Sequence, residues 1–185
     1  RRSCRPPLNA VLSGGVGSMY NDPTGREGVP HTQRQFEGLA KQVGRIVSGR
    51  GERDDKLRRT CELLAGAVAH YDWVGFYLLD AAAAALELGP FVGEPTEHVR
   101  IELGRGVCGM AAQQRKTLLI NDVAREPNYL CCSQRVLSEI VVPIFDPAGR
   151  FVGELDIDSH TPAAFGDGDR EFLEGICREL SALFG

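Results

Sequence analysis

The chain has 185 residues, of which 43% are hydrophobic and 25% charged, and its formal net charge is -4. This length suits one domain with a sizeable core, and the charges form no basic block of the kind that binds nucleic acid. No apolar run approaches the roughly 18 residues that a membrane-spanning helix needs, so we expect no membrane partner.

Residues 1–33 are rich in Gly, Pro, Ser, Asn and Arg and show no apolar period. Breaker pairs such as Pro6-Pro7 and Gly14-Gly15 interrupt this stretch. A segment of this composition cannot bury enough apolar surface to fold. We therefore expect a disordered leader over residues 1–33 and a single domain over residues 34–185.

Helical spacing of apolar residues begins at Gln33 and ends before the Gly49-Arg50-Gly51 breaker. A second helix, capped by Asp54 or Asp55, is predicted to run to Val68. Three short strands should follow, then a short helix and one more strand; their expected ranges are 73–79, 86–91, 98–103, 107–114 and 117–121. Residues 122–132 have no clean period and are expected to form a loop over the domain.

A hairpin is the strongest structural signal, with β-type runs over 139–145 and 150–159. Its turn is Asp146-Pro147-Ala148-Gly149, in which the positions of proline and glycine suit a type I turn. A final helix follows Phe165, capped by Asp167 or Asp169. This order predicts an α+β fold with a mainly antiparallel central sheet. We expect the N- and C-terminal helices on one face and loops enclosing a ligand pocket on the other.

Three acids, Glu154, Asp156 and Asp158, alternate along the second hairpin strand and therefore share one face of it. Phe151, Leu155 and Ile157 are assigned to the opposite, apolar face. The acids could belong to a solvated surface. If the middle loops cover them, they need a cation, and the ammonium group of an amino acid would serve.

The six cysteines have no CxxC pair and no repeated spacing, and no apolar stretch follows the first two arginines. A reduced, cytoplasmic protein is expected, in which any disulfide is redox-active. Cys108 lies near the start of a short helix, where amide groups favour a thiolate, although a packed inert thiol is the alternative. Cys131 and Cys132 are neighbours in the long loop, so at least one is expected to face a cavity or solvent and is a candidate nucleophile.

No histidine and cysteine spacing predicts a metal. The set His98, Cys108, Cys132 and His160 matches no ligand pattern. We expect neither a metal nor a cofactor.

Several segments resemble the GAF-fold free methionine-(R)-sulfoxide reductases. The matching segments are Trp73-Val74-Gly75-Phe76-Tyr77, residues 88–95, Gly104-Arg105-Gly106-Val107-Cys108-Gly109, residues 138–144 and Leu155-Asp156-Ile157-Asp158-Ser159. The resemblance covers roughly residues 70–180 and implies a GAF fold and a homodimer.

The resemblance also implies roles for individual residues. Cys132 falls at the position of the catalytic cysteine, and Cys108 at that of a second redox cysteine. Glu139, Asp156 and Asp158 match acids that hold the substrate, and Glu139 would also act as a proton donor. Trp73 matches the aromatic residue that packs against the S-methyl group.

The implied reaction is reduction of free methionine-(R)-sulfoxide through a Cys132 sulfenic acid, which a second thiol and then a thioredoxin-like reductant would reduce. His98 stands where the family has its usual resolving cysteine, so that role would fall to Cys108 or Cys131. The alternatives are a non-catalytic GAF sensor or binding module for a small ligand, and a thiol sensor that responds to peroxide through Cys108 and Cys132.

Overall fold

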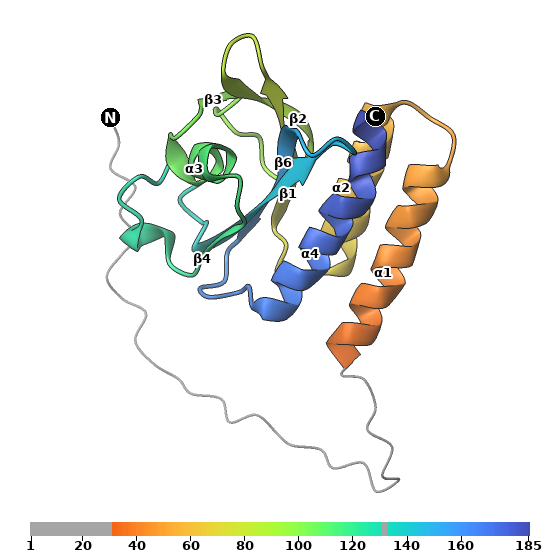
Figure 1. Ribbon diagram of the computed structural model, residues 1–185. Helices are drawn as coiled ribbons and strands as arrows, with labels where there is room; N and C mark the ends of the chain where they lie inside the picture. The colour runs from red at the N-terminus through yellow and green to blue at the C-terminus, as the bar shows by residue number, and fades with distance from the viewer. Residues whose placement is uncertain (1–30, 131–132) are drawn as a thin grey trace, which may run out of the picture.

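The structure, a computed structural model, describes residues 31–130 and 133–185. A six-stranded sheet lies between a group of three helices on one side and helix α3 on the other (Figure 1). The helices are α1 (His31–Ser48), α2 (Arg53–Ala67), α3 (Gly106–Gln114) and α4 (Asp167–Leu180), with short 3-10 turns η1 (Val123–Arg125) and η2 (Ser181–Phe184). The strands are β1 (Trp73–Asp80), β2 (Ala85–Val92), β3 (Arg100–Glu102), β4 (Leu118–Ile120), β5 (Ser138–Phe145) and β6 (Phe151–Ser159).

The strands lie in the order β3-β2-β1-β6-β5-β4, and every neighbouring pair is antiparallel. This arrangement confirms the predicted α+β class and the predicted sheet. Helices α1, α2 and α4 come from the two ends of the chain and cover one face, also as predicted (Figure 1). The predicted helices and strands all form, with bounds that differ by a few residues.

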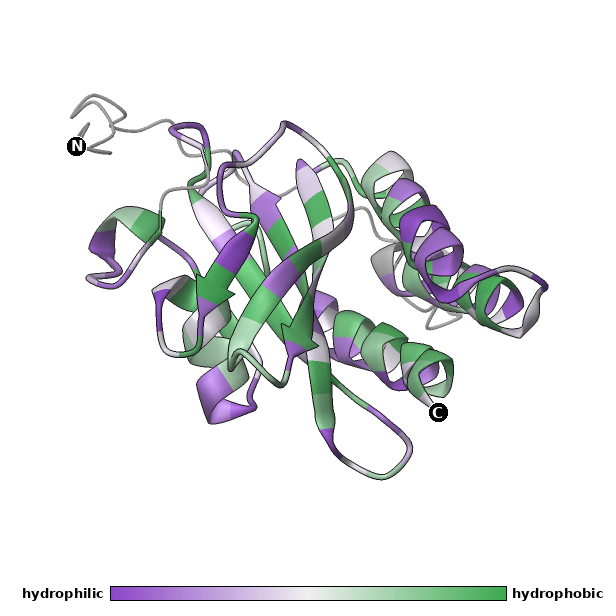
Figure 2. Ribbon diagram, turned by 90° about the horizontal axis from the view of Figure 1, so that it is seen from above, coloured by the Kyte–Doolittle hydropathy of each residue, from purple (hydrophilic) through white to green (hydrophobic). Residues whose placement is uncertain are grey.

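Alternation along the central strands divides the interior into two layers. Figure 2 shows hydrophobic and hydrophilic residues alternating along these strands. On the face toward α1, α2 and α4, residues such as Phe76, Leu155 and Ile157 are fully buried in the larger core. Cys61 and Cys177 belong to this core as buried free thiols. The other face of the sheet carries the candidate site.

Phe151 was assigned to the helical face, and that assignment is wrong. Ile144 pairs with Gly153, but the next residue, Phe145, pairs with Phe151, so β6 carries one extra residue at this point. Such a bulge shifts the alternation by one residue. Phe151 therefore packs in the second core, with its ring 6.1 Å from that of Phe145.

The predicted N-cap residues are also wrong, although Asp169 takes part in capping the last helix. The residue before α2 is Glu52, which makes no side-chain cap bond, and Asp54 and Asp55 lie inside the first turn. At α4 the N-cap is Gly166, whose backbone N–H donates to Asp169 Oδ2 at 3.0 Å. The aspartates still contribute, because negative charges in the first turn complement the helix dipole.

The hairpin turn agrees with the prediction. The Gly149 N–H donates to the carbonyl oxygen of Asp146 at 2.9 Å, and Gly149 has a φ of 79°. The Asp146 carboxylate accepts hydrogen bonds from the Ala148 and Arg150 amides and from the Arg150 guanidinium, which fixes the turn.

Helix α1 begins at His31, and the rest of the predicted leader lies outside the described residues. The division into a leader and a domain therefore stays a prediction. None of the helices in the described ranges is long and apolar enough to cross a membrane.

Candidate functional site

The register of the sheet sets residues of β1, β6 and β5 in rows on the face opposite α1, α2 and α4. One row contains Trp73, Asp158 and Glu139, because Asp158 pairs with both of the others. The next row contains Gly75, Asp156 and Val141, and a third contains Tyr77, Glu154 and Pro143. Four acids are thus neighbours on one face of two adjacent strands.

These four acids are buried. The exposed fractions are 2% for Glu139, 0% for Glu154, 1% for Asp156 and 2% for Asp158, which rules out the solvated surface as an explanation. Glu139 Oε2, both oxygens of Glu154, Asp156 Oδ1 and Asp158 Oδ1 have no hydrogen-bond partner among the described residues. Burying an unpaired carboxylate costs free energy, so a bound cation or hydrogen-bond donor at this face would be stabilising.

Burial and mutual repulsion shift how these acids titrate. Desolvation raises the pKa of Glu139 well above its ordinary value, and the charges of Asp156 and Asp158 raise it further. Desolvation and the charge of Asp156 likewise raise the pKa of Glu154 and of Asp158. Burial raises the pKa of Asp156 to about 7. Part of this cluster is therefore protonated near neutral pH and can donate protons.

A pH dependence of stability follows from these shifts. The folded-state pKa values lie above the unfolded ones, so the folded protein holds these protons more tightly. The resulting stabilisation is complete below about pH 4 and is lost as the pH rises through the folded-state pKa values. For Asp156 alone, we expect the free energy of unfolding to fall on the order of 2 kcal/mol between about pH 5 and pH 8, measured by urea denaturation.

Two variants locate the origin of this slope. Asp156→Asn should flatten it, because the amide that replaces this carboxyl group does not titrate. Asp146→Asn should leave it unchanged, because hydrogen bonds from Arg150 lower the pKa of Asp146 and keep it ionised throughout this range. Equal slopes in all three proteins would show that the buried acids do not titrate as proposed.

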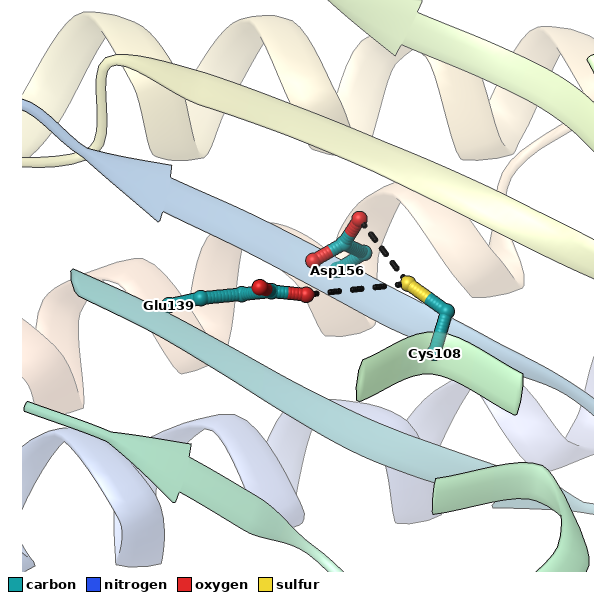
Figure 3. A group of neighbouring side chains, drawn as sticks. All are labelled: Cys108, Glu139 and Asp156. Atoms are coloured by element: carbon teal, nitrogen blue, oxygen red, sulfur yellow. Dashed lines mark hydrogen bonds between the residues drawn. The ribbon is translucent and has the colours of Figure 1, made fainter. Parts of the chain in front are cut away.

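Cys108 reaches the acids from helix α3, which lies across the sheet from the other helices. Its Sγ lies 3.3 Å from Asp156 Oδ2 and 3.8 Å from Glu139 Oε1 (Figure 3). The position of Cys108 near the helix N-terminus predicted a thiolate here. The neighbouring carboxyl groups oppose that effect, because they favour a thiol that donates a hydrogen bond.

Gly109 allows α3 to approach the sheet layer closely. A Cβ at this position would collide with the carbonyl oxygen of Glu102, and the Gly109 carbonyl accepts a hydrogen bond from the Gly104 amide at 2.7 Å. Gly109→Ala is therefore expected to lower the free energy of unfolding by about 1–3 kcal/mol through overpacking, and to displace the adjacent Cys108.

Urea denaturation and the rate of Cys108 alkylation would measure both effects of Gly109→Ala. The matched control is Gly38→Ala in α1, where an added Cβ meets no atom within 4 Å. That change should stabilise the helix by about 0.5–1 kcal/mol. A Gly109→Ala variant as stable as the wild type would contradict the close approach.

Trp73 is buried and is held by several contacts. Its indole ring lies over Gly75, where a Cβ would collide with it, and stacks on Phe91 at 5.5 Å. Its Nε1–H donates to the carbonyl oxygen of Glu94 at 3.0 Å. The ring is therefore held in place beside Asp156 and Asp158 and forms an apolar wall for anything bound to them.

A cavity of about 20 Å³ lies at the end of the acid face, and its walls include Trp73, Glu94, Ser133 and Asp158. That volume holds about one water molecule, so binding of an amino acid requires the cavity to widen.

The predicted nucleophile Cys132 and its neighbour Cys131 lie outside the described residues, but both flanks of this pair are described. Leu130 packs against Gly106 at the start of α3, and Ser133 Oγ lies 3.5 Å from Glu94 Oε2. Arg135 also forms an ion pair with Glu94. Both flanks therefore lie beside the acid face.

The structure brings together all five of the predicted site residues that it describes: Trp73, Cys108, Glu139, Asp156 and Asp158. Sequence reasoning placed Glu154 on this face but left it out of the site. Tyr77 was missed, although it lies four residues after Trp73 on the same strand and alternation could have found it. Glu94 holds Trp73 through its backbone carbonyl, for which the sequence has no signal.

Comparison with known proteins identifies the fold and its relatives. The family model of the GAF domain matches residues 52–183. GAF domain-containing protein A of Dictyostelium discoideum is 37% identical over 148 residues, which are 80% of this chain and 91% of that protein. The free methionine-R-sulfoxide reductase of Escherichia coli is 33% identical over 148 residues, which are 80% of this chain and 87% of that protein.

A solved structure gives the same result. The free methionine-R-sulfoxide reductase from Neisseria meningitidis, in complex with its substrate, superposes with a TM-score of 0.79 at 34% identity. The match covers 85% of this chain and 92% of that one. The chain therefore belongs to the GAF domain family and, within it, to the family of the free methionine-(R)-sulfoxide reductases.

Proposed function

We propose that this protein reduces free methionine-(R)-sulfoxide to methionine with electrons from thiols. The observation that carries the proposal is the set of four buried carboxyl groups without a cation among the described residues, next to a thiol and an indole wall. The ammonium group of a free amino acid supplies the missing cation. A methionine residue inside a peptide has no such group, which accounts for a preference for the free amino acid.

The first chemical step belongs to Cys132. Its sulfur attacks the sulfoxide sulfur, and the oxygen is transferred to give a Cys132 sulfenic acid and methionine. Glu139 donates the proton to the departing oxygen, because burial and the neighbouring acids raise its pKa and so favour its protonated form. Trp73 packs against the S-methyl group, while Asp156 and Asp158 hold the ammonium.

The second step belongs to Cys108. Its thiol condenses with the sulfenic acid, which releases water and forms a Cys108–Cys132 disulfide. The described residues on either side of the Cys131–Cys132 pair support contact between the two sulfurs. Leu130 packs on Gly106, two residues before Cys108, and Ser133 lines the cavity. A thioredoxin-like protein then reduces the disulfide by thiol–disulfide exchange. This requirement for reduced thiols is the reason that a cytoplasmic location stays our expectation.

The direct test incubates the purified protein with dithiothreitol and each free methionine sulfoxide epimer, and measures methionine. We expect methionine from the R epimer and little from the S epimer. N-acetylated methionine sulfoxide, which lacks the ammonium, should be a poor substrate. Absence of methionine from both epimers, together with binding of free methionine sulfoxide, would favour a non-catalytic binding module instead.

A further inference from the structure

The thiol of Cys108 and the carboxyl groups of Glu139 and Asp156 converge on one point in the interior. Their ligand atoms all lie within 4.8 Å of one another, and all three residues are buried. Figure 3 shows the two carboxyl groups, from β5 and β6, pointing toward the sulfur on α3. His98 and His160, which the sequence analysis weighed as ligands, do not belong to the ligating set found among the described residues.

The spacing of these atoms fits a tetrahedral metal ion. A zinc–sulfur bond of about 2.3 Å and a zinc–oxygen bond of about 2.0 Å put the two ligand atoms about 3.5 Å apart at a tetrahedral angle. The observed separations of Cys108 Sγ are 3.3 Å from Asp156 Oδ2 and 3.8 Å from Glu139 Oε1. Both sulfur–oxygen separations are thus close to the tetrahedral value.

The remaining oxygens give a second and independent indication. Glu139 Oε2 and Asp156 Oδ1 are buried, and no hydrogen-bond partner for either is found among the described residues. Glu154, one row further along the sheet, adds two more buried oxygens without a described partner. A dication at this point would compensate the negative charge that these groups carry once ionised.

The ligand types select the metal. Carboxylate oxygens alone would suit Mg²⁺ or Ca²⁺, which avoid sulfur, whereas a thiolate favours Zn²⁺ and similar borderline ions. Three protein ligands leave one tetrahedral position for water. We propose that the reduced protein binds Zn²⁺ through Cys108, Glu139 and Asp156, and that the Cys108 thiol proton and the protons held by the two carboxyl groups leave to solvent when the ion binds.

Zinc binding and turnover exclude each other at this site. The metal occupies the thiol and two of the acids assigned to methionine sulfoxide reduction, so the zinc-bound protein is inactive. Coordination also shields the sulfur from oxidants. The proposal itself does not depend on the reductase activity, because it rests on the ligand geometry and on the buried oxygens.

Cobalt binding to the reduced, metal-free protein tests the site, because a thiolate bound to Co²⁺ gives a charge-transfer absorption band. We expect this band at one equivalent of Co²⁺ and its loss when Zn²⁺ is added. Cys108→Ser should abolish it and Asp156→Asn should weaken binding at least tenfold. The matched control is Cys61→Ser, which changes a buried thiol in the helical core and should keep the band.

A band that persists in Cys108→Ser, or disappears in Cys61→Ser, would overturn the proposal, as would the absence of any band in the wild type. A second measurement needs no variant: Zn²⁺ should slow alkylation of Cys108 in the wild-type protein, followed by peptide mass spectrometry. Unchanged alkylation would also overturn it. If the protein binds cobalt but forms no methionine, only the proposed reductase activity is refuted. If it forms methionine but shows no absorption band, only the proposed metal site is refuted.

Discussion

Cys132→Ser is expected to lower the rate of methionine formation from free methionine-(R)-sulfoxide by at least about 10³-fold. A serine hydroxyl is not ionised at neutral pH and cannot form a sulfenic acid, so it cannot replace the thiol in the first chemical step. Binding of the substrate should survive, because the acids that hold the ammonium are unchanged. Methionine formation under dithiothreitol measures the first effect, and calorimetric titration of the variant measures the second.

The control for this variant is the same substitution elsewhere in the chain. Cys61→Ser alters a fully buried thiol that contacts the Pro90 carbonyl on the helical side of the sheet, and it should retain turnover. Full activity in Cys132→Ser would refute the role of this residue, and loss of binding as well as turnover would indicate a structural role.

Cys108→Ser separates the two thiol steps. Without the resolving thiol, the first turnover should still produce about one equivalent of methionine and leave a Cys132 sulfenic acid, which dimedone would trap. Turnover with thioredoxin should then stop. If the variant cycles normally with thioredoxin, another thiol resolves the sulfenic acid, and Cys131 becomes the candidate.

The acid face shows what alternation in a sequence can establish. Glu154, Asp156 and Asp158 were placed on one face because a strand points every second side chain the same way, and the structure agrees. Whether that face is buried was left open, since burial depends on α3 and the loops that pack over it. Those contacts come from residues far away in the sequence.

The errors have local physical causes. Phe151 was placed on the wrong face because the alternation rule assumes an unbroken strand, and the extra residue of the bulge in β6 breaks it. No structural role was predicted for Gly109. Its importance comes from the Glu102 carbonyl, which approaches so closely that no Cβ fits. Neither feature has a sequence pattern that a single chain could reveal.

Asp158→Asn is expected to have opposite effects on stability and activity. The carboxyl group is buried, has no described partner for Oδ1, and lines the cavity with Trp73. Its amide isostere needs no proton and no cation, so the ligand-free protein should become more stable at pH 8. The bound ammonium, however, loses a buried partner, an effect of about 2–5 kcal/mol that corresponds to a loss of at least about 30-fold in kcat/KM.

Asp146→Asn provides the matched comparison, because it makes the same chemical change at a carboxylate that already has partners. Asp146 accepts hydrogen bonds from Ala148 and Arg150 in the hairpin turn, so its replacement should lower stability and leave kcat/KM unchanged. Urea denaturation and steady-state kinetics on both variants would show the contrast. Asp158→Asn removes an unpaired buried charge and therefore stabilises the fold, whereas Asp146→Asn removes the acceptor of existing hydrogen bonds and therefore destabilises it. If Asp158→Asn were destabilised like Asp146→Asn, its carboxylate would be serving the fold, and the ammonium would have to be held by the other acids of the cluster.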